Sequence, residues 1–214
     1  RVPLLRRQAL AVLPIQPSGD FERFGCVASC HLDGNFGWGY KGSSYLLDTW
    51  HWKSVRTDPV GQVDDQYCAK VDFTQKNVGR HGDPGKGGYL SNRKPDKGHP
   101  LFLPDSPDAV YHGSFPASRA VEYTTPAGAA IPSGTTIPGI LTSPFQGDRA
   151  DVRCQSAYHD GRWNLYLRRK LQTGSQFDTQ FVPAGRYAFG CAAFDRTSNR
   201  HAYALPVFHL VLEL

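Results

Sequence analysis

The chain of 214 residues has no methionine, few cysteines and no apolar run long enough to span a bilayer. A chain of this length can bury an ordinary hydrophobic core, so its size does not demand support from disulfides. No signal peptide is visible, and the chain begins at Arg1. We therefore expect that an initiator residue and an export leader have been removed, together with part of the fold.

An excess of acidic residues is also lacking. The net charge is +5, and lysine and arginine are spread along the chain, with a local concentration in residues 69–97. The sequence shows no basic helix and no recognition motif, so we expect no nucleic-acid partner. A basic surface of this kind suits docking to an acidic protein partner.

Glycine and proline are abundant, with 22 and 16 residues, and aromatic residues make up 12% of the chain. This composition favours a loop-rich, mainly β fold over a helical bundle. Residues 44–56 form the most core-like stretch of the first half, and residues 76–146 are expected to be ordered loops with short strands, for example near 120–124. The clearest predicted strands are 151–157 and 162–171, which form a hairpin, and 187–194 and 206–214.

The motif with most chemical content is Cys26-Val27-Ala28-Ser29-Cys30-His31. The usual attachment signature of c-type haem is C-x-x-C-H, in which two thiols add to the porphyrin vinyl groups and the adjacent imidazole coordinates iron. Here one extra residue separates the cysteines, while the second cysteine and the histidine stay adjacent. The motif indicates one covalent haem c, held by Cys26 and Cys30 with His31 as proximal ligand. A local disulfide, a zinc site and a pair of buried thiols remain alternatives, and zinc is the weakest because the other cysteines are isolated.

A haem that transfers electrons generally has a second axial ligand, and the absence of methionine removes the common His/Met pair. Among the other histidines, His51 is the best candidate because it lies in the apolar segment Trp50-His51-Trp52-Lys53. We expect Trp50 and Trp52 to line the haem pocket as flat aromatic walls. Lys53 is the alternative ligand, since a desolvated amine can bind iron once it is deprotonated. For each histidine, a hydrogen-bonded core or surface position remains the other interpretation.

The three other cysteines have simpler interpretations. Cys154 and Cys191 fall in predicted strands of the C-terminal sheet, and they are expected to form a disulfide if those strands are neighbours. Cys68 is most simply a buried thiol.

Asp64 and Asp65 form an acidic pair that resembles a catalytic or calcium-binding pair. Neighbouring residues of an extended segment point to opposite faces, so the pair is poorly placed for either role. We expect a structural role instead, such as capping or an ion pair with Arg56.

Three segments occur in a characteristic order: DTWHWKSVRTDPVGQVDDQY, GDRADVRCQSAYHDGRWNLYLRRKLQTG and YAFGCAAFD. They resemble the D-x-W-H-W-K-x-x-R-T-x-P-x-G-x-x-D-D-Q-Y stretch, the D-G-x-W hairpin with its R-x-L-x-T-G strand, and the penultimate strand of the ethylbenzene dehydrogenase-related haem-binding domains. Relatives of these domains include the haem subunits of type II dimethyl sulfoxide reductase-like molybdenum enzymes. The resemblance covers residues 22–72 and 147–212.

The resemblance implies an antiparallel β-sandwich with long Gly/Pro-rich loops, a single domain over residues 1–214, and haem held between loops at one end. In the molybdenum-enzyme subunits the haem is b-type with Met and Lys as ligands, which a chain without methionine cannot reproduce. Residues 25–31 instead match the G-C-x-x-x-C-H segment of family members that look like c-type variants. Family members have strands before the matched segment, so we expect missing N-terminal strands. A neighbouring subunit could supply one of them and build a polymer.

We therefore expect an electron carrier and not an enzyme: a mono-haem c-type cytochrome that is exported to the periplasm or the cell exterior and serves redox partner proteins. One alternative is a haem-bearing electron-transfer subunit of a larger molybdenum oxidoreductase complex. Another is a haem-free β-sandwich module that binds carbohydrate on Trp50, Trp52 and Tyr89.

Overall fold

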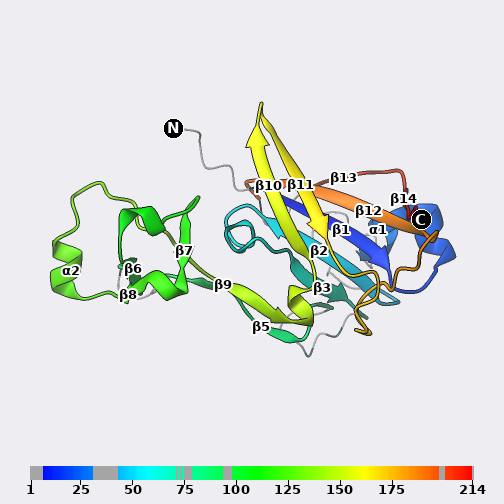
Figure 1. Ribbon diagram of the computed structural model, residues 1–214, viewed down its shortest axis with the longest axis horizontal. Helices are drawn as coiled ribbons and strands as arrows, with labels where there is room; N and C mark the ends of the chain where they lie inside the picture. The colour runs from blue at the N-terminus through cyan, green and yellow to red at the C-terminus, as the bar shows by residue number, and fades with distance from the viewer. Residues whose placement is uncertain are drawn as a thin grey trace.

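The computed structural model describes residues 7–30, 43–70, 72, 74, 79–93, 98–197 and 201–213. The protein is mainly β with antiparallel sheets arranged as a β-sandwich, as predicted (Figure 1). The strands are β1 (Arg7–Pro14), β2 (Leu47–Lys53), β3 (Asp64–Cys68), β4 (Arg80–Gly82), β5 (Gly85–Ser91), β6 (Phe102–Pro104), β7 (Ser114–Pro116), β8 (Ala120–Glu122), β9 (Ile140–Gly147), β10 (Arg153–His159), β11 (Arg162–Arg168), β12 (Arg186–Asp195), β13 (Ala202–Tyr203) and β14 (Phe208–Val211). The helices are α1 (Gly19–Cys30) and α2 (Thr125–Ala129), and short 3-10 turns lie at Asp58–Val60, Pro107–Ala109, Ala117–Arg119 and Asp148–Ala150.

The main sheet has the strand order β13-β12-β1-β2-β3-β4, and β14 also pairs with β12. Strand β1 lies near its centre, between β12 and β2, and is antiparallel to both. Its apolar residues suit this place, because Val12 and Leu13 point to opposite faces and both are buried. The predicted strands at 187–194 and 206–214 are confirmed as β12 and β14.

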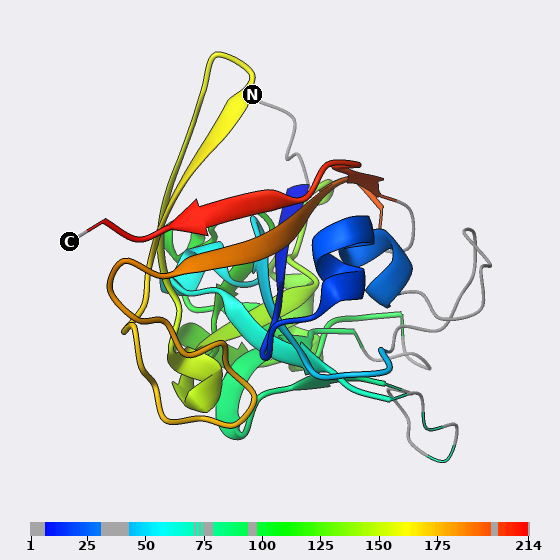
Figure 2. The same cartoon turned by 90° about the vertical axis from the view of Figure 1, so that its right-hand side faces the viewer.

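The two faces of the main sheet are covered by different elements (Figures 1 and 2). Helix α1 packs on one face, which we call the helix face; its core contains Val12, Phe21, Cys26, Leu47, Cys68 and Ala188. The hairpin β10–β11 crosses the other face, which we call the hairpin face; its core contains Trp52, Val63, Val152 and Cys154. The hairpin confirms the prediction for residues 151–171.

Residues 85–147 extend from the sandwich as an arm, seen on the left of Figure 1. Strands β5 and β9 pair along it, β7 adds a parallel partner to β9, and β6 pairs with β8. Phe115 is fully buried there with Leu141 and Ala109. The expected loops with short strands are thus confirmed, with β8 at the place predicted near 120–124. Among the described residues, no helix is both long and apolar enough to cross a bilayer.

Candidate functional site

The predicted haem-attachment segment begins inside α1. Asp20 and Glu22 lie in the first turn of this helix, where their charge complements the helix dipole. Phe21 and Cys26 point to the sheet and are 0% and 8% exposed. The Cys30 side chain and His31 lie outside the described residues, so their predicted roles stay predictions.

The thiol of Cys26 is pressed against strand β12. A Cβ added at Gly190 would lie 2.6 Å from the Cys26 Sγ, so only glycine allows this close approach. Burial, with a smaller contribution from the neighbouring Cys191, raises the pKa of the Cys26 thiol to about 11. As it lies in this structure the thiol is therefore neutral and packed, and a thioether at this sulfur requires α1 to lift from Gly190.

His51 also lies on the helix face. Leu47 and His51 are four residues apart in β2, so their side chains point to the same face, and Leu47 belongs to the helix-face core together with Cys26. The ring is 6% exposed and stacks on Phe194 of β12 with ring centroids 5.5 Å apart. Its Nδ1 lies 2.5 Å from a guanidinium nitrogen of Arg80. The structure thus brings His51 and Cys26 to one face of one sheet.

The hydrogen bond with Arg80 has a consequence for metal binding. A guanidinium has only donors, so Nδ1 of His51 accepts this bond and a neutral ring carries its proton on Nε2. That tautomer does not offer the lone pair of Nε2 to iron, and a metal-bound histidine usually donates from its other nitrogen. Coordination through Nε2 of His51 therefore requires Arg80 to move away from Nδ1.

Lys53, the alternative ligand, is engaged in a buried ion pair. Its Nζ lies 2.5 Å from Oδ2 of Asp64 and donates to the hydroxyl of Tyr89 at 3.0 Å. The other Asp64 oxygen receives hydrogen bonds from Arg149, with 2.7 Å to its Nε. The predicted structural role of Asp64 is confirmed. The predicted ion pair with Arg56 is wrong, because Lys53 of the adjacent strand β2 points to the same face of the sheet as Asp64 and pairs with it instead.

Trp50 and Trp52 lie on the hairpin face, opposite to His51. Trp52 is 2% exposed, packs edge-on against Trp163 at 4.8 Å between centroids, and donates from Nε1 to Asp58 at 3.1 Å. Trp50 packs edge-on against Phe181 at 6.1 Å. The structure does not bring these rings together with His51, since successive residues of a strand point to opposite faces.

The proposed sugar-binding residues are also separated. Tyr89 reaches Lys53 on the helix face, whereas Trp50 and Trp52 lie on the hairpin face, and Trp52 is buried. A carbohydrate platform needs exposed rings on a common surface, and these three residues do not form one.

A groove runs between the main sheet and the hairpin, on the hairpin face. It consists of two adjoining hollows of about 440 and 620 Å³. The first is walled by Trp50 and Trp52 with Cys191 beside them, and the second contains Arg7 and His201. Both hollows share the same small and apolar residues: Ala9, Trp52, Leu165, Ala193 and Ala202. Its size and apolar walls suit a flat organic cofactor.

The expected disulfide between Cys154 and Cys191 is wrong. Cys154 lies in β10 and Cys191 in β12, which belong to different sheets, and both are free thiols. Burial raises the pKa of Cys154 to about 12. Cys68 is a buried free cysteine, as predicted.

A second buried site, which sequence reasoning missed, gathers four carboxylates near the hairpin face. One side-chain oxygen each of Asp48, Asp65 and Asp178 lies within 4.8 Å of the others, and all three residues are 0% exposed. The main-chain amide of Asp83 donates to the carbonyl of Asp65 at 3.1 Å, and Asp83 is 3% exposed. We call these four residues the aspartate cluster.

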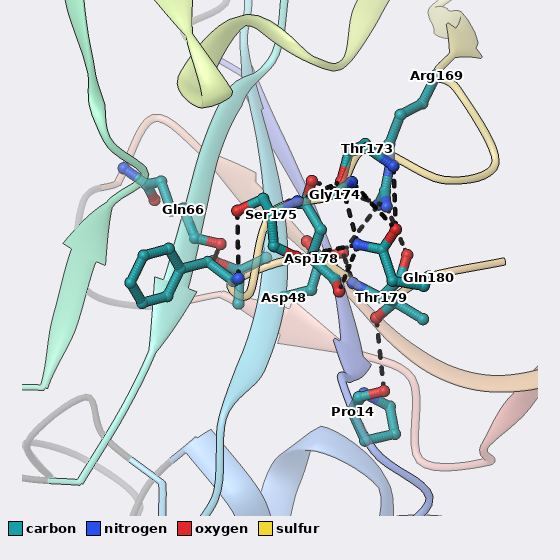
Figure 3. Close-up of polar contacts among 12 residues, drawn as sticks. Pro14, Asp48, Gln66, Arg169, Thr173, Gly174, Ser175, Asp178, Thr179 and Gln180 are labelled. Atoms are coloured by element: carbon teal, nitrogen blue, oxygen red, sulfur yellow. Dashed lines mark hydrogen bonds and ion pairs between the residues drawn. The ribbon is translucent and has the colours of Figure 1, made fainter.

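One buried arginine faces the aspartate cluster. Arg169 donates to Oδ2 of Asp48 at 2.9 Å and lies 3.8 Å from Oδ2 of Asp178, and the amide of Thr179 also donates to Asp48 at 3.0 Å (Figure 3). Desolvation is the main cause that raises the pKa of Asp48 to about 7 and that of Asp83 to about 8, and it raises the pKa of Asp65 well above its usual range. No local sequence pattern indicates this cluster, because its four residues come from separate segments of the chain.

Comparison with known proteins yields one family match. The family model for ethylbenzene dehydrogenase matches residues 10–204. This range includes α1, most of the main sheet and all four residues of the aspartate cluster. No curated protein matches the chain.

Proposed function

Because the chain belongs to the ethylbenzene dehydrogenase family, which is related to the haem-bearing electron-transfer subunits of molybdenum enzymes, we propose that it carries electrons through haem and transforms no substrate. Haem iron supplies reversible one-electron oxidation and reduction. The observation that carries the proposal is the placement of Cys26 and His51 on one face of the main sheet, the face covered by α1, which contains both cysteines of the C-x-x-x-C-H segment.

In the finer form of the proposal, one haem c is attached through Cys26 and Cys30, with His31 as proximal and His51 as distal ligand. Phe194 holds the His51 ring in a fixed plane by stacking on it. Release of Arg80 from Nδ1 frees the ring to take the ligating tautomer. The ion pair with Asp64 makes Lys53 the weaker candidate, because its ammonium group is held toward the carboxylate.

The groove favours a second candidate, in which haem binds without a covalent link and the protein is a subunit of a molybdenum oxidoreductase complex. The apolar walls suit a porphyrin, and the half-buried Trp50 offers one of the flat surfaces expected for it, with the buried Trp52 beside it. Arg7, at the polar end of the groove, suits a propionate, and His201 is a nitrogen donor in the same hollow.

Extraction of the haem separates the two candidates. A pyridine haemochrome spectrum first establishes that the purified protein contains haem. We then expect the haem to stay with the polypeptide through acid-acetone extraction, and Cys26→Ser and Cys30→Ser each to reduce the retained haem. Haem that leaves completely would contradict thioether attachment and favour the groove. A protein isolated without haem that takes up none on reconstitution would contradict both candidates.

Replacement of the candidate ligands tests the iron site. We expect His51→Ala to convert a low-spin haem spectrum to high-spin, because iron loses its distal nitrogen. His159→Ala is the matched control, since His159 is exposed at the turn of the β10–β11 hairpin, and it should leave the spectrum unchanged. If the haem stays low-spin in His51→Ala but becomes high-spin in His201→Ala, the haem binds in the groove and His201 is its ligand.

We further propose that the protein is exported to the periplasm or cell exterior and exchanges electrons with redox partner proteins or within a larger redox complex. The c-type motif supports the export, and the family membership supports the larger redox complex. The formation of a polymer, in which a neighbouring subunit supplies a missing N-terminal strand, stays a prediction from the family resemblance.

A further inference from the structure

The aspartate cluster carries more negative charge than its surroundings neutralise. Within the described part of the chain, the buried cation that contacts these carboxylates is Arg169, which reaches Asp48 and Asp178. Asp48 receives hydrogen bonds from Arg169 and from the Thr179 amide through one oxygen only. A buried carboxylate without a counter-charge is costly, so the group demands either protons or a bound cation.

The unused oxygens point to a cation ligand. Both carboxylate oxygens of Asp65, Asp83 and Asp178 are buried and accept no hydrogen bond, and Oδ1 of Asp48 is in the same state. Asp83 comes from a fourth segment, directly after β4, and the negative charges of Asp178 and Asp48 contribute to the raised pKa of its carboxyl, which lies among these residues. Seven buried carboxylate oxygens of these four residues thus lack a hydrogen-bond donor, and one oxygen each of Asp48, Asp65 and Asp178 lies within 4.8 Å of the others.

The chemistry of these ligands selects the ion. Carboxylate oxygens are hard ligands, which suit Ca²⁺ and Mg²⁺ and are poor ligands for metals that prefer sulfur or imidazole. Ca²⁺ accepts six to eight oxygens in irregular geometry, whereas Mg²⁺ demands a near-ideal octahedron and keeps several waters. A buried group with several unpartnered carboxylate oxygens suits Ca²⁺ better. We propose that Asp48, Asp65, Asp83 and Asp178 form a calcium site.

The position of this site indicates what the ion does. Asp48 and Asp65 belong to β2 and β3, whereas Asp178 belongs to the loop between β11 and β12 that crosses the sheet in Figure 3. A shared ion fastens this loop to the sheet. The loop also carries Arg169 and Phe181, which pack on Trp50 with Arg169 Cζ 5.3 Å from the ring centroid. The calcium site thus supports one wall of the groove.

Calcium binding by the full chain, treated with EDTA and dialysed, tests the proposal. Isothermal titration calorimetry should show one site for Ca²⁺ and much weaker binding of Mg²⁺. Saturating Ca²⁺ should raise the melting temperature by about 5 to 10 °C, as expected for a ligand at ~100 times its dissociation constant. Terbium luminescence should report the same site and be quenched when Ca²⁺ displaces Tb³⁺.

Single substitutions distinguish the aspartate cluster from surface acids. Asp65→Asn and Asp178→Asn keep the shape but remove a charge, so each should weaken Ca²⁺ binding at least ~10-fold. Asp108→Asn is the matched control, because Asp108 is exposed and pairs with Arg119, and it should bind Ca²⁺ as the parent does. If both cluster variants fail to fold, the titrations of the parent decide.

Three results would overturn the calcium site. The first is a parent chain that shows no heat with Ca²⁺ and melts at the same temperature in Ca²⁺ and in EDTA. The second is an equal response to Mg²⁺, which would reject the choice of ion. The third is unchanged Ca²⁺ affinity in a folded Asp65→Asn variant, which would place the ion elsewhere.

Discussion

Asp64 binds two cations in the interior of the molecule, Lys53 through Oδ2 and Arg149 through Oδ1. The side chains of Asp64 and Lys53 are 0% and 5% exposed, so water cannot replace either partner. A truncation on one side leaves buried charge with incomplete compensation, which usually costs more than the pair itself contributes.

We therefore expect Lys53→Met to lower the free energy of unfolding by about 3 kcal/mol, measured by urea denaturation. The comparison is Asp195→Asn, which breaks the largely exposed pair with Arg7 and should cost at most about 1 kcal/mol. Equal effects of the two substitutions would show that the Lys53–Asp64 pair is not buried as described. The haem spectrum of Lys53→Met should match that of the parent, because the proposed ligand is His51.

Helix α1 packs so closely on strand β12 that the residue at position 190 must be glycine. A Cβ at Gly190 would meet the Sγ of Cys26 at 2.6 Å and its Cβ at 2.8 Å, and both α1 and β12 are held in place by the core between them. Gly190→Ala should therefore lower the melting temperature, with an overpacking cost of about 1–3 kcal/mol. Gly19→Ala, where nothing lies within 4 Å, is the control and should be nearly neutral. A melting temperature unchanged in Gly190→Ala would mean that α1 does not rest on β12.

The strands of the last third were predictable from periodicity and turn residues, but most strands of the first two thirds, helix α1 and the pairing of the strands were not. The same alternation that separates Asp64 from Asp65 also separates His51 from Trp50 and Trp52. Applied to the W-H-W segment, this rule predicts that the histidine and the tryptophans serve different faces. The disulfide prediction for Cys154 and Cys191 failed for another reason, because membership of a common sheet cannot be inferred from strand pattern alone.

For the whole molecule, the family resemblance and the β fold were accessible from sequence because several motifs occur in order along the chain. The aspartate cluster was not accessible. Asp48 and Asp65 meet through the pairing of β2 with β3, but Asp178 arrives from a loop far along the chain, and only the three-dimensional fold brings it there. Asp65 cannot share a site with its neighbour Asp64, because the two side chains point to opposite faces of the sheet. It does share a site with Asp48 and Asp178, which lie on the same face as its own side chain.

The aspartate cluster also determines how the stability of the whole protein depends on pH. An aspartate in the unfolded chain titrates near pH ~4, while folding raises the pKa of Asp48 to about 7 and that of Asp83 to about 8. A carboxyl whose pKa is raised by folding stabilises the native state below its unfolded pKa, and this contribution is lost as the pH rises through the folded pKa.

In EDTA, the free energy of unfolding should therefore fall between pH ~5 and ~8. The raised pKa values of Asp48 and Asp83 set the size of this fall, which should be on the order of a few kcal/mol. In saturating Ca²⁺ the fall should be much smaller, since the ion compensates the charges that protons otherwise remove. Urea denaturation at intervals of about one pH unit in both buffers gives the comparison, and histidine titration affects both curves alike. Parallel curves in EDTA and Ca²⁺ would show that the carboxylates do not exchange protons for calcium, and a rise in EDTA over this range would contradict their raised pKa values.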